Sequence, residues 1–468
     1  MAVGSNRLSD NAPISSRLRR TTRLGSLVAA QGGRIAGGRA LDRVRSDEAR
    51  ERAQAKRTAD VVEQIVIQLG RMKGAAMKVG QVLSTVEFPG MEVEGSERIQ
   101  RRLAELRDDA PSVPWPRLEK LMAAEWGQPV SKVFADVEPE AMAAASIGQV
   151  HRATTHEGVE VAVKVQYPGI AEAVDADLRN LKVLMPLLAR IAPGLDTKAL
   201  AEELRERISE ELDYELEAAA QRRVWRIWRD HPHVLVPKVD TELSTRRVLV
   251  TERHEGMRFD DLKNADAARR DRVAEIVHRF YYWTADAHNL ALGDPHPGNW
   301  QSLPDGRVAM FDFGMLRALP RGHVRREGPA LSAVHEQDGD ALFDVMLNLG
   351  YLSDGKEFTD RRRLLLAHMT IAAAWLIEDQ PFRLGPEVQR EMGEQLFALG
   401  RDWRAMVRAF SMPSESVLLR RMTDLLFVSF CQLRAAGDWW ALAEELQLGR
   451  GPRTPLGHEH AEWRSDRR

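Results

Sequence analysis

The chain has 468 residues, 44% of them hydrophobic, and a formal net charge of −2 at pH 7. This length allows two or three domains with a sizeable core, and the balanced charge argues against a nucleic-acid partner. The single cysteine, Cys431, excludes a disulfide framework or a cysteine-based metal site and fits a reducing cytosol. We also see no secretory signal and no apolar run long enough to cross a membrane. We therefore expect a cytoplasmic protein without a transmembrane segment.

The chain begins with a basic arm. Residues 1–57 are rich in Arg, Gly, Ser and Ala, and Asp10 is the only acid before position 41. We expect this arm to be disordered and solvated. The alternative is a peripheral membrane contact, in which the basic residues bind anionic lipid with the help of Leu18, Leu24, Leu27 and Val28.

A helix is predicted over residues 58–86. Its apolar residues recur with helical spacing and form one stripe, which comprises Val62, Val66, Leu69, Met72, Ala76, Val79 and Leu83. Lys78 and Gln81 fall outside this stripe, and Gly80 costs about 1 kcal/mol in a helix interior relative to Ala. Close approach of another backbone would compensate for that cost. Spacing alone favours a solvated surface lysine at position 78.

After a second predicted helix at 115–125, a small-residue turn leads into an alternating β-branched run over residues 159–165. The turn consists of Ala143, Ala144, Ala145, Ser146, Ile147, Gly148, Gln149 and Val150. Two strands joined by such a turn let backbone N–H groups approach phosphate oxygens, because small side chains do not block the way. The second strand carries Val161, Ala162, Val163 and Lys164, a kinase pattern whose lysine binds the nucleotide phosphates. The alternative is a solvated lysine at a strand edge.

A long helix is predicted over residues 199–228, and it concentrates acids. They are Glu210, Glu211, Asp213, Glu215 and Glu217. Asp213 and Glu217 lie four residues apart, a mildly destabilising pair on a helix. The acids either form a solvated face or have cationic partners, and Lys164 is the candidate partner of Glu217. The side chains of Glu211 and Asp213 point in well-separated directions, so the helix could contact two different neighbours.

Two short strands, 235–236 and 248–250, precede the residues Thr251, Glu252 and Arg253. In a kinase-like chain this is the crossing from the small lobe to the large one, where the backbone pairs with an adenine edge. A helix over 268–290 then presents a loop that contains Asp294 and Asn299.

The acid and the amide of this loop are five residues apart, as in the catalytic loop of protein kinases. There the Asp orients the attacking hydroxyl and the Asn holds a metal ion. A turn over 303–307 and an apolar strand over 308–311 follow, and the strand delivers Asp312 of an Asp-Phe-Gly sequence. Oxygen ligands on both sides of a hairpin suit a small hard cation such as Mg²⁺. The alternative is a Pro/Gly-rich loop with solvated acids.

With these motifs in place, residues 60–320 resemble the UbiB/AarF family of atypical protein-kinase-like proteins. The hallmark Lys-x-Gly-Gln of that family matches Lys78, Gly80 and Gln81, and its Ala-rich phosphate loop matches residues 143–150. Its nucleotide lysine, Glu-x-Asp motif and lysine-pairing acid match Lys164, Glu211, Asp213 and Glu217. Its catalytic loop and Asp-Phe-Gly match Asp294, Asn299 and residues 312–314. In relatives the Lys-x-Gly-Gln segment covers the active site and meets the Glu-x-Asp pair.

The resemblance implies an α+β, two-lobe, atypical protein-kinase-like fold. The expected parts are the arm 1–57, a helical extension 58–138, a small β-sheet lobe 139–252, a helical lobe 253–446 and a disordered tail 447–468. It also implies binding of ATP with Mg²⁺, slow ATPase activity and support of ubiquinone or other isoprenoid-quinone biosynthesis at a membrane surface. Asp294, Lys164 and Glu217 would be catalytic. Ala162 and Glu252 would contact the nucleotide along with the Ala-rich loop.

Two alternatives stay open. A small-molecule phosphotransferase of the aminoglycoside or choline kinase type also uses Asp-x-His-x-x-Asn, here Asp294, His296 and Asn299. That class lacks the Lys-x-Gly-Gln segment. The second alternative is a non-catalytic scaffold that uses its nucleotide as a conformational ligand. A lidded active site would exclude phosphorylation of other proteins.

Overall fold

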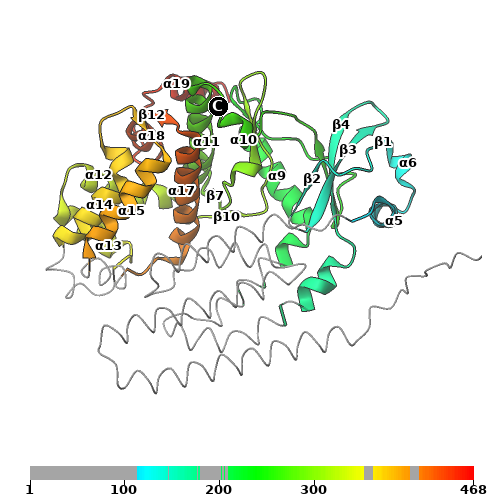
Figure 1. The fold of residues 1–468 in the computed structure, drawn as a ribbon, viewed down its shortest axis with the longest axis horizontal. Helices are drawn as coiled ribbons and strands as arrows, with labels where there is room; N and C mark the ends of the chain where they lie inside the picture. Colours follow the sequence, from blue (N-terminus) through cyan, green and yellow to red (C-terminus); the bar gives the residue numbers. More distant parts are fainter. Residues whose placement is uncertain are drawn as a thin grey trace, which may run out of the picture. The chain divides into compact units, whose positions relative to one another are not determined.

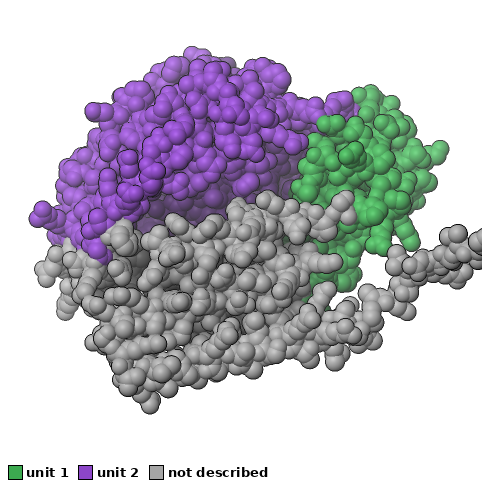
Figure 2. Space-filling model, viewed as in Figure 1, with its two compact units in different colours: residues 1–158, 162–214, 245–249 green, residues 159–161, 215–244, 250–468 purple. Residues whose placement is uncertain are grey.

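The computed structural model describes residues 113–145, 147–176, 178–179, 202, 205, 209–352, 362–400 and 410–467. The chain divides into two compact units (Figure 2). The first comprises residues 1–158, 162–214 and 245–249, and the second comprises residues 159–161, 215–244 and 250–468. Helices and short, mostly antiparallel strands alternate along the chain, which confirms the predicted α+β class (Figure 1).

The largest sheet has five strands. They are β1 Phe134–Val137, β2 Ala143–Ala144, β3 Gly148–Thr155, β4 Glu160–Gln166 and β6 Val248–Glu252. The hydrogen-bonded order is β1-β3-β4-β6, and β2 also pairs with β3. In β4 the buried Val161, Val163 and Val165 alternate with the half-buried Ala162 and Lys164. This period of two is what the β-branched pattern predicts, and it places Ala162 and Lys164 on one face.

Two short helices, α5 Trp115–Trp126 and α6 Val130–Val133, precede this sheet, and α5 confirms the helix predicted at 115–125. The other strands are short: β5 Val234–Leu235, β7 Leu290–Leu292, β8 Trp300–Ser302, β9 Val308–Met310, β10 Leu316–Ala318, β11 Phe382–Arg383 and β12 Ala436–Gly437. The remaining helices are α9 Tyr214–Trp228, α10 Phe259–Leu262, α11 Ala267–His288, the 3₁₀ helix η2 Pro297–Asn299, α12 His323–His335, α13 Gly339–Asn348, α14 Arg362–Ile377, α15 Pro386–Ala398, α17 Ser414–Leu433, α18 Trp439–Leu446 and α19 Pro455–Ser465.

Helix α11 is the centre of the core of the second unit. All of its residues from 273 to 285 except Glu275 are buried. The Asp266 carboxylate caps its first turn by accepting from the backbone N–H of Arg269 at 2.9 Å. Asn289 ends the helix in the left-handed conformation, with φ of 53°. Helices α12, α17 and α18 pack against α11 (Figure 1). The residues that follow the C-terminus of α11 therefore start from a fixed position.

The prediction of one continuous helix over 199–228 is wrong in its described part. The chain is not helical at Leu212 and Asp213, and α9 starts afresh at Tyr214. The N–H of Asp213 donates to the carbonyl of Glu210 at 3.1 Å, and the N–H of Tyr214 donates to the carbonyl of Arg246 at 2.9 Å. The N–H of Tyr214 therefore has its partner outside the helix. Glu211 and Asp213 lie before α9, and Glu217 lies within it.

The prediction of a disordered tail over 447–468 is also wrong. Residues 455–465 form α19, and the Thr454 hydroxyl caps this helix by accepting from the backbone N–H of Gly457 at 3.1 Å. Pro455 occupies the first turn, where proline suits a helix. Leu456, His460 and Trp463, four and three residues apart, are buried. The polar composition of the segment conceals this short apolar stripe.

The basic arm, the helix predicted at 58–86 and Ser146 lie outside the described residues. Lys78, Gly80 and Gln81 belong to that helix, so their predicted roles stay predictions. In the part of the chain that the structure describes, no helix combines the length and apolar character that a membrane crossing requires.

Candidate functional site

The loop that carries Asp294 is fixed at its first residue. The N–H of Gly293 donates to the carbonyl of Met315 at 3.1 Å, which extends the antiparallel pairing of β7 with β10. A Cβ atom added to Gly293 would lie 2.0 Å from Leu418 Cδ1 of α17. A side chain at position 293 would have to displace the packed Leu418 side chain, the loop or α17. The entry to the loop is thus held between β10 and α17.

The other end of the loop is closed by Asn299. Its side-chain Nδ2 donates to the carbonyl of Asp294 at 2.9 Å, and its backbone N–H donates to the carbonyl of His296 at 2.8 Å. The Nδ1 of His296 accepts from the N–H of Gly298 at 3.1 Å and caps η2. The two residues that the sequence pairs by spacing are therefore joined by a hydrogen bond from the Asn299 side chain to the Asp294 backbone.

Asp312 follows β9 and lies beside this loop. The N–H of Phe311 donates to the carbonyl of Asn299 at 2.9 Å, which joins the strand to the catalytic loop. The Asp312 Oδ1 accepts from the N–H of Gly314 at 2.9 Å, and the Phe313 side chain is buried. Backbone bonds therefore set the positions of both predicted metal ligands.

The donor set of Asn299 and Asp312 fits Mg²⁺. The Nδ2 of Asn299 is committed to Asp294, so the amide oxygen is the atom that would face a cation. An amide and a carboxylate oxygen are hard ligands of the kind that Mg²⁺ prefers. No group of three or more His, Cys, Asp and Glu side chains suited to a metal ion occurs among the described residues. The two oxygens would therefore share a bound ion with phosphate and water oxygens, as is usual for Mg²⁺.

Two residues near the acids carry no signal in the local sequence. Arg421 of α17 places its Nη2 4.0 Å from Asp294 Oδ1, and the two side chains are only 11% and 12% exposed. Tyr281 of α11 is buried, and burial raises the pKa of its hydroxyl well above 10, with a further contribution from the negative charges of Asp294 and Asp312. Tyr281 is thus a neutral phenol next to two acids. Both residues come from helices distant in sequence from the loop, which is why spacing did not identify them.

In the first unit, Lys164 lies on β4 with its Nζ 4.9 Å from the centre of the Tyr214 ring, a cation–π contact. Gly148 opens β3 close to the neighbouring backbone. A Cβ there would lie 2.2 Å from the carbonyl oxygen of Val165 and 2.9 Å from the Tyr214 hydroxyl. Glycine at position 148 is therefore required by the packing of β3 on β4.

The side chains of the Ala-rich hairpin differ in their exposure. Ala143 and Ala144 are exposed, whereas Ile147 and Gln149 are buried. The Gln149 Oε1 accepts from the N–H of Val113 at 2.6 Å. Ala145 and Val150 are half-buried. Ala143 and Ala144 thus present their side chains to the surface, whereas the side chains of Ile147 and Gln149 belong to the interior.

The predicted acids have distinct environments. Glu217 is buried in α9, in the second unit, while Lys164 belongs to the first unit. Asp213 Oδ2 lies 3.7 Å from the Nε of Arg246 in the first unit, and Glu211 is half-buried. The pairing of Lys164 with Glu217 stays a prediction. The pairing of Lys78 with Glu211 and Asp213 also stays a prediction.

Glu252 ends β6, and its backbone N–H donates to the carbonyl of Lys238 at 2.9 Å. Its carboxylate accepts from the N–H of Lys238 at 3.0 Å, and hydrogen bonding with His254 lowers the pKa of that carboxylate. The N–H of the next residue, Arg253, donates to the carbonyl of Glu160. These two N–H groups are committed within the chain, so an adenine contact at Glu252 would use its carbonyl oxygen.

Asp294 precedes the β8–β9 hairpin, and Asn299 and Asp312 flank it, on an α+β scaffold. This arrangement is typical of kinase-like proteins. The family model for the ABC1 atypical kinase-like domain matches residues 105–346, and the chain belongs to this family. The resemblance to the UbiB/AarF proteins is thereby confirmed.

Known relatives agree with this assignment. The chloroplastic protein ACTIVITY OF BC1 COMPLEX KINASE 7 of Arabidopsis thaliana is 29% identical over 382 residues, which cover 78% of this chain and 52% of that protein. The mitochondrial atypical kinase COQ8 of Saccharomyces cerevisiae is 29% identical over 295 residues, 62% of this chain and 58% of that protein. The chain thus spans somewhat more than half the length of these two relatives.

A solved structure also matches the fold. It is that of the Mycobacterium tuberculosis protein Rv3197 in complex with erythromycin, with 30% sequence identity and a TM-score of 0.65. The match covers 84% of this chain and 98% of that one. The expected kinase-like fold is therefore confirmed.

Proposed function

We propose that this protein is an ATP-dependent, UbiB-like atypical kinase or ATPase. The observation that carries the proposal is the hydrogen-bonded assembly of Asp294, Asn299 and the Phe311 backbone. In this assembly the Asn299 side chain donates to the Asp294 carbonyl, and the Phe311 N–H, next to Asp312, donates to the Asn299 carbonyl. These contacts support the proposal that Asp294 orients an acceptor while Asn299 and Asp312 hold a metal ion. Membership of a kinase-like family supports a phosphotransferase in general.

The proposed roles follow from the chemistry of each residue. Asp294 orients the attacking hydroxyl or water, and Asn299 and Asp312 hold Mg²⁺. When bound, Mg²⁺ neutralises phosphate charge during transfer. Lys164 binds the nucleotide phosphates, and Glu217 fixes that lysine. The Ala-rich hairpin covers the phosphates, while Ala162 and the Glu252 backbone contact the base.

We further propose that the acceptor is water or a small lipid-like molecule, and that the pathway is ubiquinone or another isoprenoid-quinone or lipid metabolism. The family resemblance supports this proposal, as does the similarity to an atypical kinase named COQ8. Contact with a membrane would be peripheral, through the basic arm at residues 1–57. Transfer to other proteins is not expected, because the segment with Lys78, Gly80 and Gln81 covers the site in relatives.

The test is phosphate release from Mg²⁺-ATP by the full chain, with and without anionic liposomes and quinone-precursor-like phenols. Asp294→Asn should abolish release, because the amide cannot accept the proton of the nucleophile. Asp305→Asn is the matched control, since Asp305 is a half-exposed turn acid whose carboxylate binds Arg307. Equal release by Asp294→Asn and the wild type would contradict the proposal.

A second candidate is a small-molecule phosphotransferase of the aminoglycoside or choline kinase type. The observation in its favour is that His296 shapes the loop between Asp294 and Asn299, which gives the Asp-x-His-x-x-Asn arrangement of that class. Phosphate transfer from labelled ATP to an aminoglycoside or choline, with no effect of phenols or lipid, would support it. The third alternative, a nucleotide-switched scaffold, predicts ATP binding without turnover in every one of these conditions.

A further inference from the structure

Helix α19 and the residues after it contact the end of α9, the helix that carries Glu217. Four side chains face this end: Glu459, His460 and Trp463 of α19, and Arg467, which follows the helix. The spacing of the three α19 residues places them along one side of the helix. Each of the four has a partner between residues 226 and 233, in the last turn of α9 or the loop that follows. His460 and Trp463 also contact the Trp283 ring of α11. The end of α9 is therefore a neighbour that all four side chains share.

Arg467 binds the last carbonyl groups of α9. Its Nη1 donates to the carbonyl oxygens of Ile227 at 2.8 Å and Arg229 at 3.1 Å, and its Nη2 donates to that of Arg226 at 3.0 Å. Carbonyl groups in the last turn of a helix have no partner within the helix. A guanidinium at this end also complements the partial negative charge of the helix dipole. Arg467 thus caps α9 from another element.

Trp463 lies against the last residue of α9. The rings of Trp463 and Trp228 are stacked, with centroids 5.8 Å apart and planes at 12°. Trp228 is buried, and its Nε1 donates to the Thr284 hydroxyl of α11 at 2.9 Å. The end of α9 is therefore enclosed between α11 and α19.

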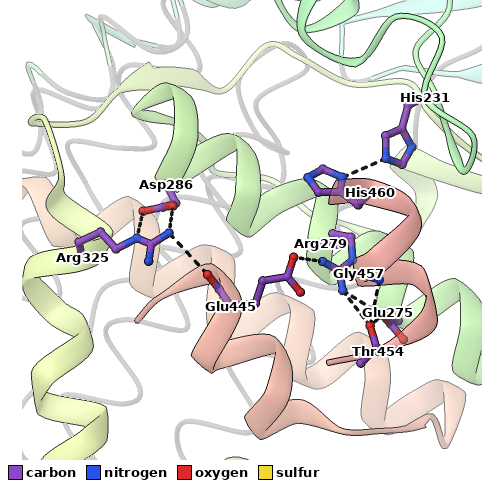
Figure 3. Close-up of polar contacts among 9 residues, drawn as sticks. All are labelled: His231, Glu275, Arg279, Asp286, Arg325, Glu445, Thr454, Gly457 and His460. Carbon is purple, nitrogen blue, oxygen red and sulfur yellow. Dashed lines mark hydrogen bonds and ion pairs between the residues drawn. The ribbon is translucent and has the colours of Figure 1, made fainter. Parts of the chain in front are cut away.

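The loop after α9 is held by a pair of histidines (Figure 3). The Nδ1 of His231 accepts from the backbone N–H groups of His233 and Val234, both at 3.0 Å. Its Nε2 therefore carries the hydrogen and donates to the Nδ1 of His460 at 3.0 Å. The Nε2 of His233 lies 2.9 Å from a carboxylate oxygen of Glu459.

The position of α19 is itself fixed by α11 and α18, independently of α9 (Figure 3). Arg279 of α11 donates to the Thr454 hydroxyl at 3.0 Å and to the Glu445 carboxylate at 2.6 Å. A Cβ on Gly457 would lie 2.8 Å from Glu445 Oε2 and 3.0 Å from the Arg279 guanidinium. The start of α19 is thus closely packed on α11 and α18, so α19 can serve as a fixed support.

We propose that α19 positions α9, and that Arg467 and Trp463 are positioning residues for Glu217. This inference rests on the proposed function, in which Glu217 fixes the nucleotide lysine. Glu217 lies nine residues before Arg226, a distance of about 14 Å along a helix. A tilt of about 10° at the held end would move Glu217 by about 2 Å, and a misplacement of about 1 Å can cost a hundredfold in rate.

The experiment compares Arg467→Ala with Arg464→Ala in the full chain. Arg464 is the matched control, because it lies in the last turn of α19, three residues before Arg467, but its guanidinium lies over the Trp283 ring of α11. Arg467→Lys tests rescue, since a lysine can still bind one or two carbonyl groups. Hydrogen exchange is measured at residues 218–228, with the amides of α11 as the internal reference. Affinity for Mg²⁺-ATP is measured in parallel.

In Arg467→Ala, exchange should accelerate at least about threefold along α9, including residues 218–222 near Glu217, while α11 stays unchanged. Affinity for Mg²⁺-ATP should fall about tenfold in Arg467→Ala, and in Arg467→Lys by less. Arg464→Ala should match the wild type in both. Faster exchange confined to residues 226–228, or equal behaviour of Arg467→Ala and Arg464→Ala, would overturn the inference. If the wild type fails to bind ATP, the proposed function fails, and the exchange at residues 218–222 still decides whether α19 positions α9.

Discussion

The loop from Gly293 to Gly314 and the attachment of α19 are held by different kinds of bonds. In the loop, backbone N–H and carbonyl groups make most of the contacts, as between Phe311 and Asn299. The attachment of α19 to α9 depends on side chains, above all the His231–His460 pair, the Trp228–Trp463 stack and the Arg467 guanidinium.

This difference predicts different vulnerabilities. Backbone bonds do not titrate and survive most substitutions, so the loop should change only where added atoms displace the chain. Side-chain bonds depend on protonation and on the identity of single residues. The attachment of α19 should therefore respond to pH and to point substitutions that leave the loop intact.

Acid should have the largest effect, and it acts on the side-chain contacts. Burial lowers the pKa of His231 to about 2 and that of His460 to about 3, with nearby positive charges adding to the effect. Both are therefore neutral in the folded protein, while the unfolded chain binds protons below about pH 6.5. The free energy of unfolding should thus be undiminished above that pH and fall as the pH drops toward 3. At pH 5 the loss is about 2 kcal/mol for each histidine.

Thermal unfolding at pH 7 and pH 5 measures this loss. His460→Gln keeps an acceptor for His231 but does not titrate, so the difference in Tm between the two pH values should shrink. An unchanged difference in His460→Gln would show that this pair is not the source of the acid sensitivity.

The second prediction concerns the backbone-held loop. A Cβ at position 293 meets Leu418 Cδ1 at 2.0 Å. Because Leu418 is buried and has little room to move aside, we expect Gly293→Ala to push the loop and Asp294 out of place. Overpacking of this kind costs about 1–3 kcal/mol, and we expect ATP turnover to fall at least about tenfold. Leu418→Ala in the same chain makes room for the added methyl group and should restore part of the activity. Turnover of the double variant no higher than that of Gly293→Ala would contradict this account.

The smallest expected effect is that of Ala144→Gly in the hairpin. Ala144 pairs with Gln149 and is exposed, so the change removes no packing. Glycine adopts positive φ more readily than alanine and costs about 0.5–1 kcal/mol of order in a strand. A looser hairpin should change the affinities for ATP and ADP a few-fold. Identical affinities for both nucleotides before and after the change would refute a tuning role for the Ala-rich loop.

Local patterns predicted the elements whose contacts are local in sequence. The alternation of Val161, Val163 and Val165 predicted β4, and the spacing of Asp294 and Asn299 predicted a loop that one side-chain hydrogen bond closes. The two loop residues are near each other in the chain, and β4 pairs with β3 directly before it, so periodicity and spacing carry the information. The pairing of β4 with the distant β6 left no such local signal.

The rest could not be predicted because the partners are far apart in sequence. Arg421 reaches Asp294 only because Leu418, one turn earlier on α17, packs on Gly293. Residues 447–468 look polar and disordered until α9 and α11 supply partners for Trp463 and Arg467. Thr454 and Pro455 are a local signal for the start of α19. In a short and mostly polar segment, this signal alone does not distinguish a helix from a turn.

The most direct test of the central claim is calorimetric titration of the full chain with ATP, with and without Mg²⁺, for the wild type and Asp312→Asn. The account predicts Mg²⁺-dependent binding by the wild type. In Asp312→Asn it predicts an affinity at least about tenfold lower, because the metal loses an anionic ligand. Equal affinities in the two proteins, or wild-type binding that is the same without Mg²⁺, would contradict the assignment of Asn299 and Asp312 as the metal site of an ATP-dependent enzyme.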